Sequence, residues 1–219
     1  MKRDALNIYG DGKVLTKGGL GVDVASQRED DLDRTAIEFI RARNSPSVLE
    51  IGCGLGGQSL RMAEAGAVVT ALDMHDYSES MPSHDRITFV QGDLSSFEPA
   101  PAVRYDAIFS QRTIHYLPFD KAVAALKRLV ENHLSPGGTL FLSASGLQSE
   151  LGRLYPHDTL RVGSRFTSLS PDMAEKHGIH APVCLYTCKD MAELISACGL
   201  TPGVWASPFG NIKAIGVSC

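Results

Sequence analysis

A run of glycines followed by an acidic residue is the part of the sequence best suited to bind a ligand. The run GCGLGG at 52–57 follows an apolar segment at 47–51, and Asp73 ends the next apolar segment, 21 residues beyond Gly52. Glycines carry no Cβ atom and let a ligand approach the backbone, and the N–H groups that begin a helix attract negative charge. A carboxylate at the end of the next strand can bind two ribose hydroxyls. The pair predicts a nucleotide site, with a plain tight turn and a solvated strand end as the alternative.

A carboxylate beside the glycine run bears on the charge of the ligand. Gly52, Gly54 and Gly57 also satisfy the G-x-G-x-x-G dinucleotide fingerprint. Glu50 precedes the first glycine by two residues, so its carboxylate would repel a pyrophosphate and favour a cationic ligand. A nicotinamide-dependent oxidoreductase using the same loop therefore stands as the second hypothesis.

A histidine follows a later strand, where an acceptor would meet the ligand. The segment 112–117 comes after the apolar segment 105–110, and ligands of open α/β sheets bind beyond the carboxyl ends of strands. His115 can accept a proton near neutral pH, so it is the candidate catalytic base if the acceptor must lose a proton. A structural histidine that orders the loop has equal weight, and Tyr9 and Tyr116 are weaker candidates.

Alternating strands and helices position these residues. Short apolar segments predict five strands, at 47–51, 67–72, 87–90, 105–110 and 139–144. Helical spacing of apolar residues predicts helices at 59–65 and 118–133, and SPGG at 135–138 predicts a turn. This alternation is typical of an α/β fold with a parallel sheet covered by helices on both faces.

The N-terminal quarter is predicted to hold an arm and a helix. Residues 1–25 are rich in glycine and are expected to form a loop or flexible arm. Residues 26–29 have the S-x-x-E form of a capping box, which predicts a helix reaching about Arg43. Its expected buried face is formed by Leu32, Ala36, Ile37 and Ile40.

A polar segment at 145–187 interrupts the alternation and is expected to be an insertion, or lid, over an acceptor site. Five of its side chains are candidates for acceptor binding, with a solvated loop as the alternative: Arg153, Tyr155, His157, Arg161 and Arg165. After it, Thr187 and Asp190 predict a capped helix. Two strands, at 204–206 and 212–217, close the chain and should pair antiparallel because the link between them is short.

Five motifs, in order, resemble class I S-adenosylmethionine-dependent methyltransferases of the small-molecule type. The segment VLEIGCGLG at 48–56 resembles their first motif, E-x-G-x-G-x-G. The other four are LDM at 72–74, QGDL at 91–94, YDAIFS at 105–110 and LSPGGTL at 134–140. The resemblance implies a single domain over 1–219 with a Rossmann-like, doubly wound, seven-stranded sheet, mostly parallel with the last strand antiparallel. It also implies S-adenosylmethionine as cofactor and in-line methyl transfer to a small-molecule acceptor.

The resemblance further implies roles around the amino-acid part and the ribose of the cofactor. Glu50 would orient the glycine loop or the ammonium group, and Asp73 would hold the ribose. The backbone of the loop would face the amino-acid part, through residues that include Gly52, Cys53, Gly54 and Gly56.

The resemblance also implies which residues would contact the adenine and the methyl-donor end of the cofactor. Met74 would pack on the adenine, and Asp93 would accept a hydrogen bond from its amino group. Leu94 would offer a backbone N–H, and Ser110 and Gln111 would lie under the methyl-donor end. Plain core packing is the alternative for Met74 and Leu94.

Composition excludes several classes of protein. The 219 residues carry a net charge of −4, with 43% hydrophobic and 21% charged residues, which describes an ordinary globular chain. No apolar run is long enough to span a membrane. No block of basic residues is suited to bind the phosphate backbone of a nucleic acid. The first twelve residues lack the apolar stretch of a signal peptide, and five cysteines, an odd number, favour reduced thiols in a cytoplasmic protein.

The remaining alternatives concern metal and catalysis. His177, His180, Cys184 and Cys188 match no clean zinc spacing, so no metal is expected. The oxidoreductase hypothesis is further weakened because the Tyr-x-x-x-Lys spacing occurs only at 9–13, before the first strand. A module that binds S-adenosylmethionine without transferring methyl is the third hypothesis. The sequence predicts neither the identity of the acceptor nor the oligomeric state.

Overall fold

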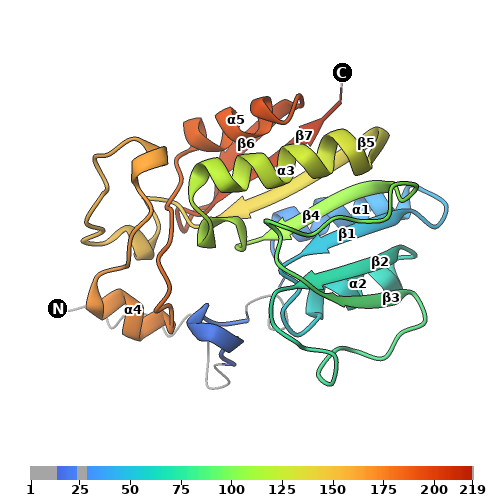
Figure 1. The fold of residues 1–219 in the computed structure, drawn as a ribbon, viewed down its shortest axis with the longest axis horizontal. Coiled ribbons are helices and arrows are strands. Elements are labelled where there is room, and N and C mark those ends of the chain that lie inside the picture. The colour runs from blue at the N-terminus through green and yellow to red at the C-terminus, as the bar shows by residue number, and fades with distance from the viewer. Residues whose placement is uncertain (1–13, 24–28, 219) are drawn as a thin grey trace.

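The computed structural model describes residues 14–23 and 29–218, which form a seven-stranded sheet with helices around it (Figure 1). The strands are β1 (Ser47–Ile51), β2 (Val68–Asp73), β3 (Ile87–Gln91), β4 (Tyr105–Gln111), β5 (Leu134–Ala144), β6 (Thr201–Ala206) and β7 (Ile212–Val217). Their order is β3-β2-β1-β4-β5-β7-β6. Neighbours from β3 to β5 are parallel, and β7 pairs antiparallel with β5 and β6. The Rossmann-like sheet predicted from the sequence is confirmed.

Helices cover both faces of this sheet. They are α1 (Asp31–Arg41), α2 (Gly57–Glu64), α3 (Phe119–His133) and α5 (Cys188–Ala197), whereas α4 (Pro171–His177) lies in the segment 145–187, away from the sheet (Figure 1). One face packs against α1 and α2 through Leu32 and Met62, and the other packs against α3 and α5 through Leu126 and Met191 (Figure 1). In β1, Val48 joins the first core and Leu49 the second, because successive side chains of a strand point to opposite faces. Burial on both faces explains the continuous apolar runs.

The start of α1 differs from the prediction. Asp30 is the N-cap: its Oδ1 accepts from Leu32 N at 2.9 Å and Asp33 N at 3.2 Å, and Asp33 Oδ2 accepts from Asp30 N at 2.7 Å. The start predicted at 26–29 was therefore wrong, because the pair Asp30 and Asp33 forms an equivalent capping box closer to the apolar face. Ser26 itself lies outside the described residues. The predicted buried face is confirmed.

The tract 135–138 is a bulge inside β5 rather than a turn before it. Pairing with β4 jumps from Tyr105 opposite Leu134 to Ala107 opposite Thr139, so the residues between Leu134 and Thr139 leave the ladder. Gly137 supplies the positive φ of 73° that this detour requires.

The insertion has a small core of its own, which its polar composition concealed. Its buried apolar residues are Leu151, Tyr155, Leu169, Met173, Ile179, Val183 and Leu185. Arg165 is also buried, and its Nη1 lies 2.7 Å from Asp190 Oδ2 on α5 and donates to Leu185 O. Tyr155 OH hydrogen-bonds to Val183 O at 2.6 Å. These contacts fix the insertion against the sheet, beyond the carboxyl ends of the parallel strands (Figure 1).

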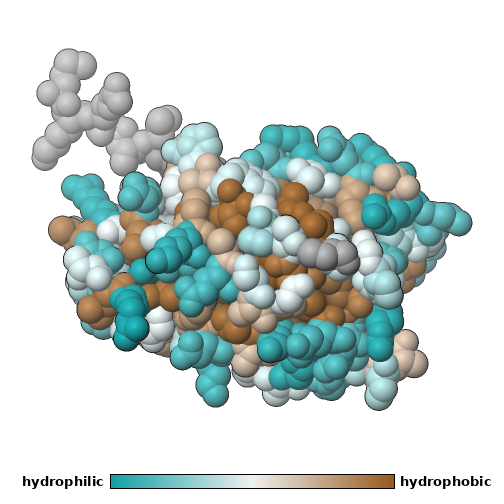
Figure 2. Space-filling model, turned by 90° about the horizontal axis from the view of Figure 1, so that it is seen from above, coloured by the Kyte–Doolittle hydropathy of each residue, from teal (hydrophilic) through white to brown (hydrophobic). Residues whose placement is uncertain are grey.

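None of the helices in 14–23 and 29–218 is long and apolar enough to cross a bilayer. Figure 2 shows a face on which hydrophobic residues are interspersed with hydrophilic side chains, with hydrophilic residues gathered around the rim.

Candidate active site

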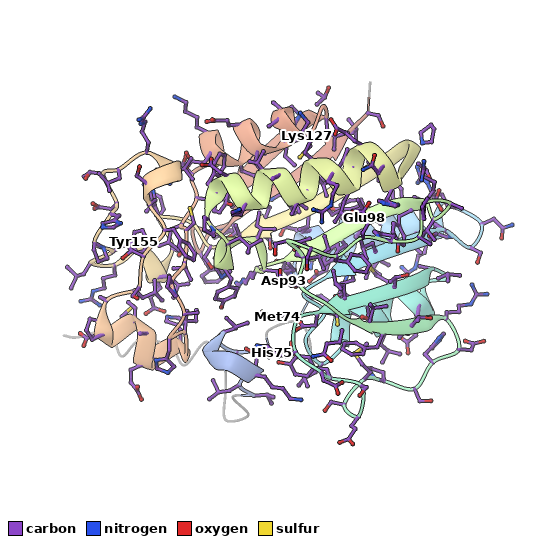
Figure 3. The ribbon with its side chains drawn as sticks, viewed as in Figure 1. Met74, His75, Asp93, Glu98, Lys127 and Tyr155 are labelled. Atoms are coloured by element: carbon purple, nitrogen blue, oxygen red, sulfur yellow. The ribbon has the colours of Figure 1, made fainter. Side chains whose placement is uncertain are left out.

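A cavity of about 710 Å³ lies where the parallel strands end. Its floor comes from β1, β2 and β4 and the loops that follow them, and its walls come from the arm at 14–23 and from the insertion. Figure 3 shows Met74 and Asp93 at the sheet side of this space and Tyr155 within the insertion. The cavity occupies the position at which open α/β sheets bind ligands.

The glycine loop is folded tightly against β2. Gly52, Gly54 and Gly56 have φ values of 73°, 52° and 79°, in the left-handed region that favours glycine. The N–H groups of Gly52 and Cys53 both donate to Leu72 O, at 2.8 Å and 3.1 Å. A Cβ on Gly52 would lie 2.0 Å from Thr113 Oγ1. The loop therefore depends on glycine for both its backbone angles and its close packing.

Asp73 lies beside this loop and supports it. Its Oδ2 accepts from Gly54 N at 3.0 Å, and its Oδ1 accepts from His75 N at 2.9 Å. Each carboxylate oxygen has further acceptor capacity, so the group can also bind hydroxyls in the cavity. On the neighbouring loop, Asp93 Oδ1 accepts from Ser95 N at 2.8 Å and lines the same cavity.

Most of the predicted site residues meet in this cavity. Those in its lining are Gly52, Cys53, Gly54, Asp73, Met74, Asp93, Leu94, Gln111 and His115. Three others, Glu50, Gly56 and Ser110, lie behind the lining. Gly56 is the N-cap of α2, and Ser110 is fully buried in β4. These three support the wall of the cavity rather than form its surface.

Glu50 is buried under the glycine loop and accepts a hydrogen bond from Ser59 Oγ of α2. Burial raises the pKa of its carboxyl to about 8, although the Ser59 hydroxyl and the charge of Arg61 oppose this shift. Glu50 thus joins the loop to the first turn of the following helix. The contact fits the loop-orienting role implied by the resemblance.

The raised pKa predicts a pH-dependent stability. The folded protein holds the proton of Glu50 more tightly than the unfolded chain does, so stability is lost as the pH rises from about 4.5 to about 8. Glu50→Gln keeps an acceptor for Ser59 and removes the charge. We expect the variant to melt at least about 5 °C above the parent protein at pH 8, with the difference shrinking towards pH 5. Thermal melts from pH 5 to pH 9 measure this, with the exposed Glu64→Gln as control. A difference that does not vary with pH would show that Glu50 is not the titrating group.

The arm supplies lining residues that the sequence analysis did not identify. Asp23 is 5% exposed, lines the cavity, and its Oδ2 accepts from Leu55 N in the glycine loop at 3.1 Å. Lys17 N donates to Tyr77 OH at 2.7 Å, and Gly21 N donates to Gly178 O at 3.0 Å. Over 14–23 the arm therefore spans from the sheet side to the insertion. Asp23 reaches the site only through contacts with residues distant in sequence, so no local sequence pattern predicts its role.

The five candidate acceptor residues of the insertion all lie outside the cavity lining: Arg153, Tyr155, His157, Arg161 and Arg165. Arg165 and Tyr155 are used in the structural contacts of the insertion. The insertion lines its side of the cavity with other residues, among them Leu151, Phe166 and Ile179. Glu150, Lys176 and His177 form a cluster of ionisable side chains there.

Within the described ranges, no group of three or more His, Cys, Asp or Glu side chains is arranged to hold a metal ion. The cysteines of the described chain are free thiols: Cys53, Cys184, Cys188 and Cys198. Burial raises the pKa of the Cys184 and Cys198 thiols to about 12, which keeps them protonated and unreactive.

Comparison with known proteins agrees with this geometry. Residues 48–138 match the family model described as "Methyltransferase domain". Over this segment the chain is similar to class I S-adenosylmethionine-dependent methyltransferases. The matched segment holds β1 to β4, the glycine loop, Asp73 and His115, so the methyltransferase domain includes the sheet side of the cavity.

Individual relatives resemble this methyltransferase domain over different lengths. The ubiquinone biosynthesis O-methyltransferase of Xanthomonas campestris is 31% identical over 125 residues, covering 51% of this chain and 49% of the relative. The chain thus spans about half the length of these curated relatives.

Solved structures share their fold with a larger part of the chain than the sequence relatives match. The 1,6-didemethyltoxoflavin-N1-methyltransferase of Burkholderia thailandensis has a TM-score of 0.60 and 19% identity, covering 87% of this chain and 79% of that one. The CcbJ methyltransferase of Streptomyces caelestis has a TM-score of 0.65 and 16% identity, covering 90% and 93%. At these identities the likeness concerns the fold of the methyltransferase domain.

Proposed function

We propose that the protein transfers a methyl group from S-adenosylmethionine to a small-molecule acceptor. The observation that carries the proposal is the convergence of the glycine loop and Asp73 in one cavity with His115. The family match over 48–138 and the methyltransferases named among the relatives support the same activity. The cavity of about 710 Å³ is large enough for a nucleoside cofactor with a small acceptor beside it.

The residues of the cavity fit a cofactor with a ribose and a positive charge. Asp73 would accept hydrogen bonds from the ribose hydroxyls, and Met74 and Leu94 would lie against the adenine, with Asp93 at its edge. The Asp23 carboxylate lies at the glycine loop, on the side where the amino-acid part would lie. This arrangement favours a cationic ligand over a pyrophosphate.

The chemistry that the bound cofactor supplies is an activated methyl group on a sulfonium. The protein residues then position the acceptor in line with this methyl group and exclude water, which is the larger part of catalysis when the donor is already activated. We propose that the arm at 14–23 and the insertion at 145–187 act as lids for this purpose. Their mutual contacts over the cavity, including Gly21 N to Gly178 O, support this role.

The two alternatives make different demands on the site. A nicotinamide-dependent oxidoreductase would place a pyrophosphate against the Asp23 carboxylate, which is electrostatically unfavourable. A module that only binds S-adenosylmethionine would need no closed acceptor space, whereas the cavity extends from the glycine loop to the insertion. Methyl transfer to an acceptor distinguishes an enzyme from such a module.

Ligand-dependent melting tests the cofactor. S-adenosylmethionine and S-adenosylhomocysteine at about 100 times their dissociation constants are expected to stabilise the protein by about 2.7 kcal/mol, and so to raise its melting temperature by about 5–10 °C. NAD and NADP at the same concentrations are expected to leave it unchanged. Stabilisation by a nicotinamide cofactor and none by S-adenosylmethionine would overturn the proposal.

Location and partners follow from the same proposal. We propose a cytoplasmic enzyme with a small-molecule acceptor and with no nucleic-acid or membrane partner. The free cysteines and the mildly acidic charge of −4 support this.

A further inference from the structure

The turn between β6 and β7 brings an exposed aromatic residue to the cavity. Phe209 lines the cavity together with Pro208 and Asn211 of the same turn, and it is 69% exposed. Contact between a large apolar ring and water is unfavourable, so an exposed aromatic residue in a cavity lining is suited to pack against a ligand. Nothing in the glycine loop or in the loops after β2 and β3 has this combination of exposure and aromatic character.

Close backbone packing holds this turn against the start of the insertion. A Cβ on Gly146 would lie 2.1 Å from Gly210 O, and a Cβ on Gly210 would lie 2.3 Å from Gln148 C. Gly210 also has a φ of 75°, in the left-handed region that favours glycine. Within the turn, Gly210 N donates to Ser207 O at 2.9 Å. The fold thus fixes the backbone beside Phe209 while leaving this residue exposed.

The sheet topology assigns this turn to the part of the cavity away from the proposed cofactor residues. β6 runs antiparallel to β7, and β7 antiparallel to β5, so β6 ends at the same edge of the sheet as the parallel strands. In the strand order, β3 and β6 lie at opposite ends of the sheet. The proposed adenine and ribose contacts follow β2 and β3, whereas the turn at 207–211 follows β6. The insertion, against which the turn packs, adds apolar lining through Leu151 and Phe166.

We infer that Phe209 is a specificity-determining residue, which packs against an apolar group of the acceptor and shields it from water. The inference rests on the proposed function and names a residue by which the site selects its acceptor. Binding of an apolar group at Phe209 removes apolar surface of both partners from water, which a fully polar acceptor cannot do. Because the backbone of the turn is fixed before the acceptor arrives, the contact requires little ordering of the chain. Phe209 takes no part in the bond changes of methyl transfer.

Variants of Phe209 test this contact through the rate of methyl transfer. The parent protein and its variants are incubated with S-adenosylmethionine carrying a tritium-labelled methyl group and with one low-molecular-weight fraction of a cell extract. The fraction is diluted until the rate is proportional to its amount. The ratio of two rates then equals the ratio of kcat/KM for the same acceptor, whatever its concentration. We expect Phe209→Ala to lower the rate about 5- to 50-fold, and Phe209→Leu, which keeps an apolar side chain, about 2- to 5-fold.

Leu154 supplies the matched control. It is an apolar residue of the insertion, 77% exposed and outside the cavity lining, so Leu154→Ala is expected to keep the parent rate. Calorimetric titration is expected to show the same affinity for S-adenosylhomocysteine in all variants.

Two results would overturn the inference and leave the proposed function intact. One is an equal rate for the parent protein and Phe209→Ala, and the other is a loss of affinity for S-adenosylhomocysteine that accounts for the lower rate. The absence of any labelled product with the parent protein would instead overturn the proposed function, and the role of Phe209 with it.

Discussion

Gly52→Ala is expected to lower the melting temperature by about 4–20 °C and to abolish measurable binding of S-adenosylhomocysteine. The residue has a φ of 73°, which costs a residue with a Cβ about 1–2 kcal/mol. The new Cβ would also lie 2.0 Å from Thr113 Oγ1 and 2.7 Å from Thr113 Cβ, so a further 1–3 kcal/mol of overpacking, roughly, is expected. The loop or the segment after β4 must move, and both line the cavity.

A second glycine with a similar φ distinguishes the cost of the backbone angle from the cost of the steric contact with Thr113. Gly199, beyond the end of α5, has a φ of 78°, and a Cβ there would meet nothing within 4 Å. Gly199→Ala is expected to cost only the backbone term, about 1–2 kcal/mol, with cofactor binding unchanged. Thermal melts and calorimetric titration of both variants measure these effects. Equal losses of stability, with binding retained by both, would show that close packing of the loop against Thr113 does not shape the site.

Asp73→Ala is expected to weaken S-adenosylhomocysteine binding at least about 10-fold, and by 100-fold or more if both ribose hydroxyls bind this carboxylate. Each hydrogen bond to a charged group contributes about 1.5–3 kcal/mol. The variant also removes the acceptor for Gly54 N at 3.0 Å, which loosens the loop. Asp73→Asn keeps one carbonyl oxygen and is expected to have an intermediate affinity.

The control for this prediction is an aspartate distant from the cavity lining. Asp85 precedes β3, and its side chain is 90% exposed, so Asp85→Ala is expected to bind as the parent protein does. Isothermal titration calorimetry of the three variants compares them on one scale. An unchanged dissociation constant for Asp73→Ala would remove this residue from the cofactor site.

Local patterns were sufficient to predict the sheet side of the site. Asp73 was placed at the end of a strand because the apolar run before it ends there. The glycine loop was predicted because its glycines, which have positive φ angles, follow a short apolar strand directly. The capped helix from Cys188 was predicted because its capping box, Thr187 and Asp190, is contained in four residues. Features of this kind are determined by neighbours in the chain, so a single sequence displays them.

Features that depend on distant contacts escaped prediction. Asp23 reaches Leu55, 32 residues later, and Arg165 pairs with Asp190, 25 residues later. The latter pairing makes Arg165 structural, although its residue type had suggested a role in acceptor binding. His115 Nδ1 likewise accepts from the N–H of Ser145, 30 residues later. Composition and spacing hold no information on such partners.

A crystal structure of the protein with S-adenosylhomocysteine bound is the most direct test of the account. The account predicts the ribose hydroxyls within hydrogen-bond distance of the Asp73 carboxylate and the adenine between Met74 and Leu94. It also predicts the sulfur turned towards the end of β4, where Arg112 and His115 line the cavity. A ligand whose ribose lies away from Asp73, or one bound outside this cavity, would contradict the account.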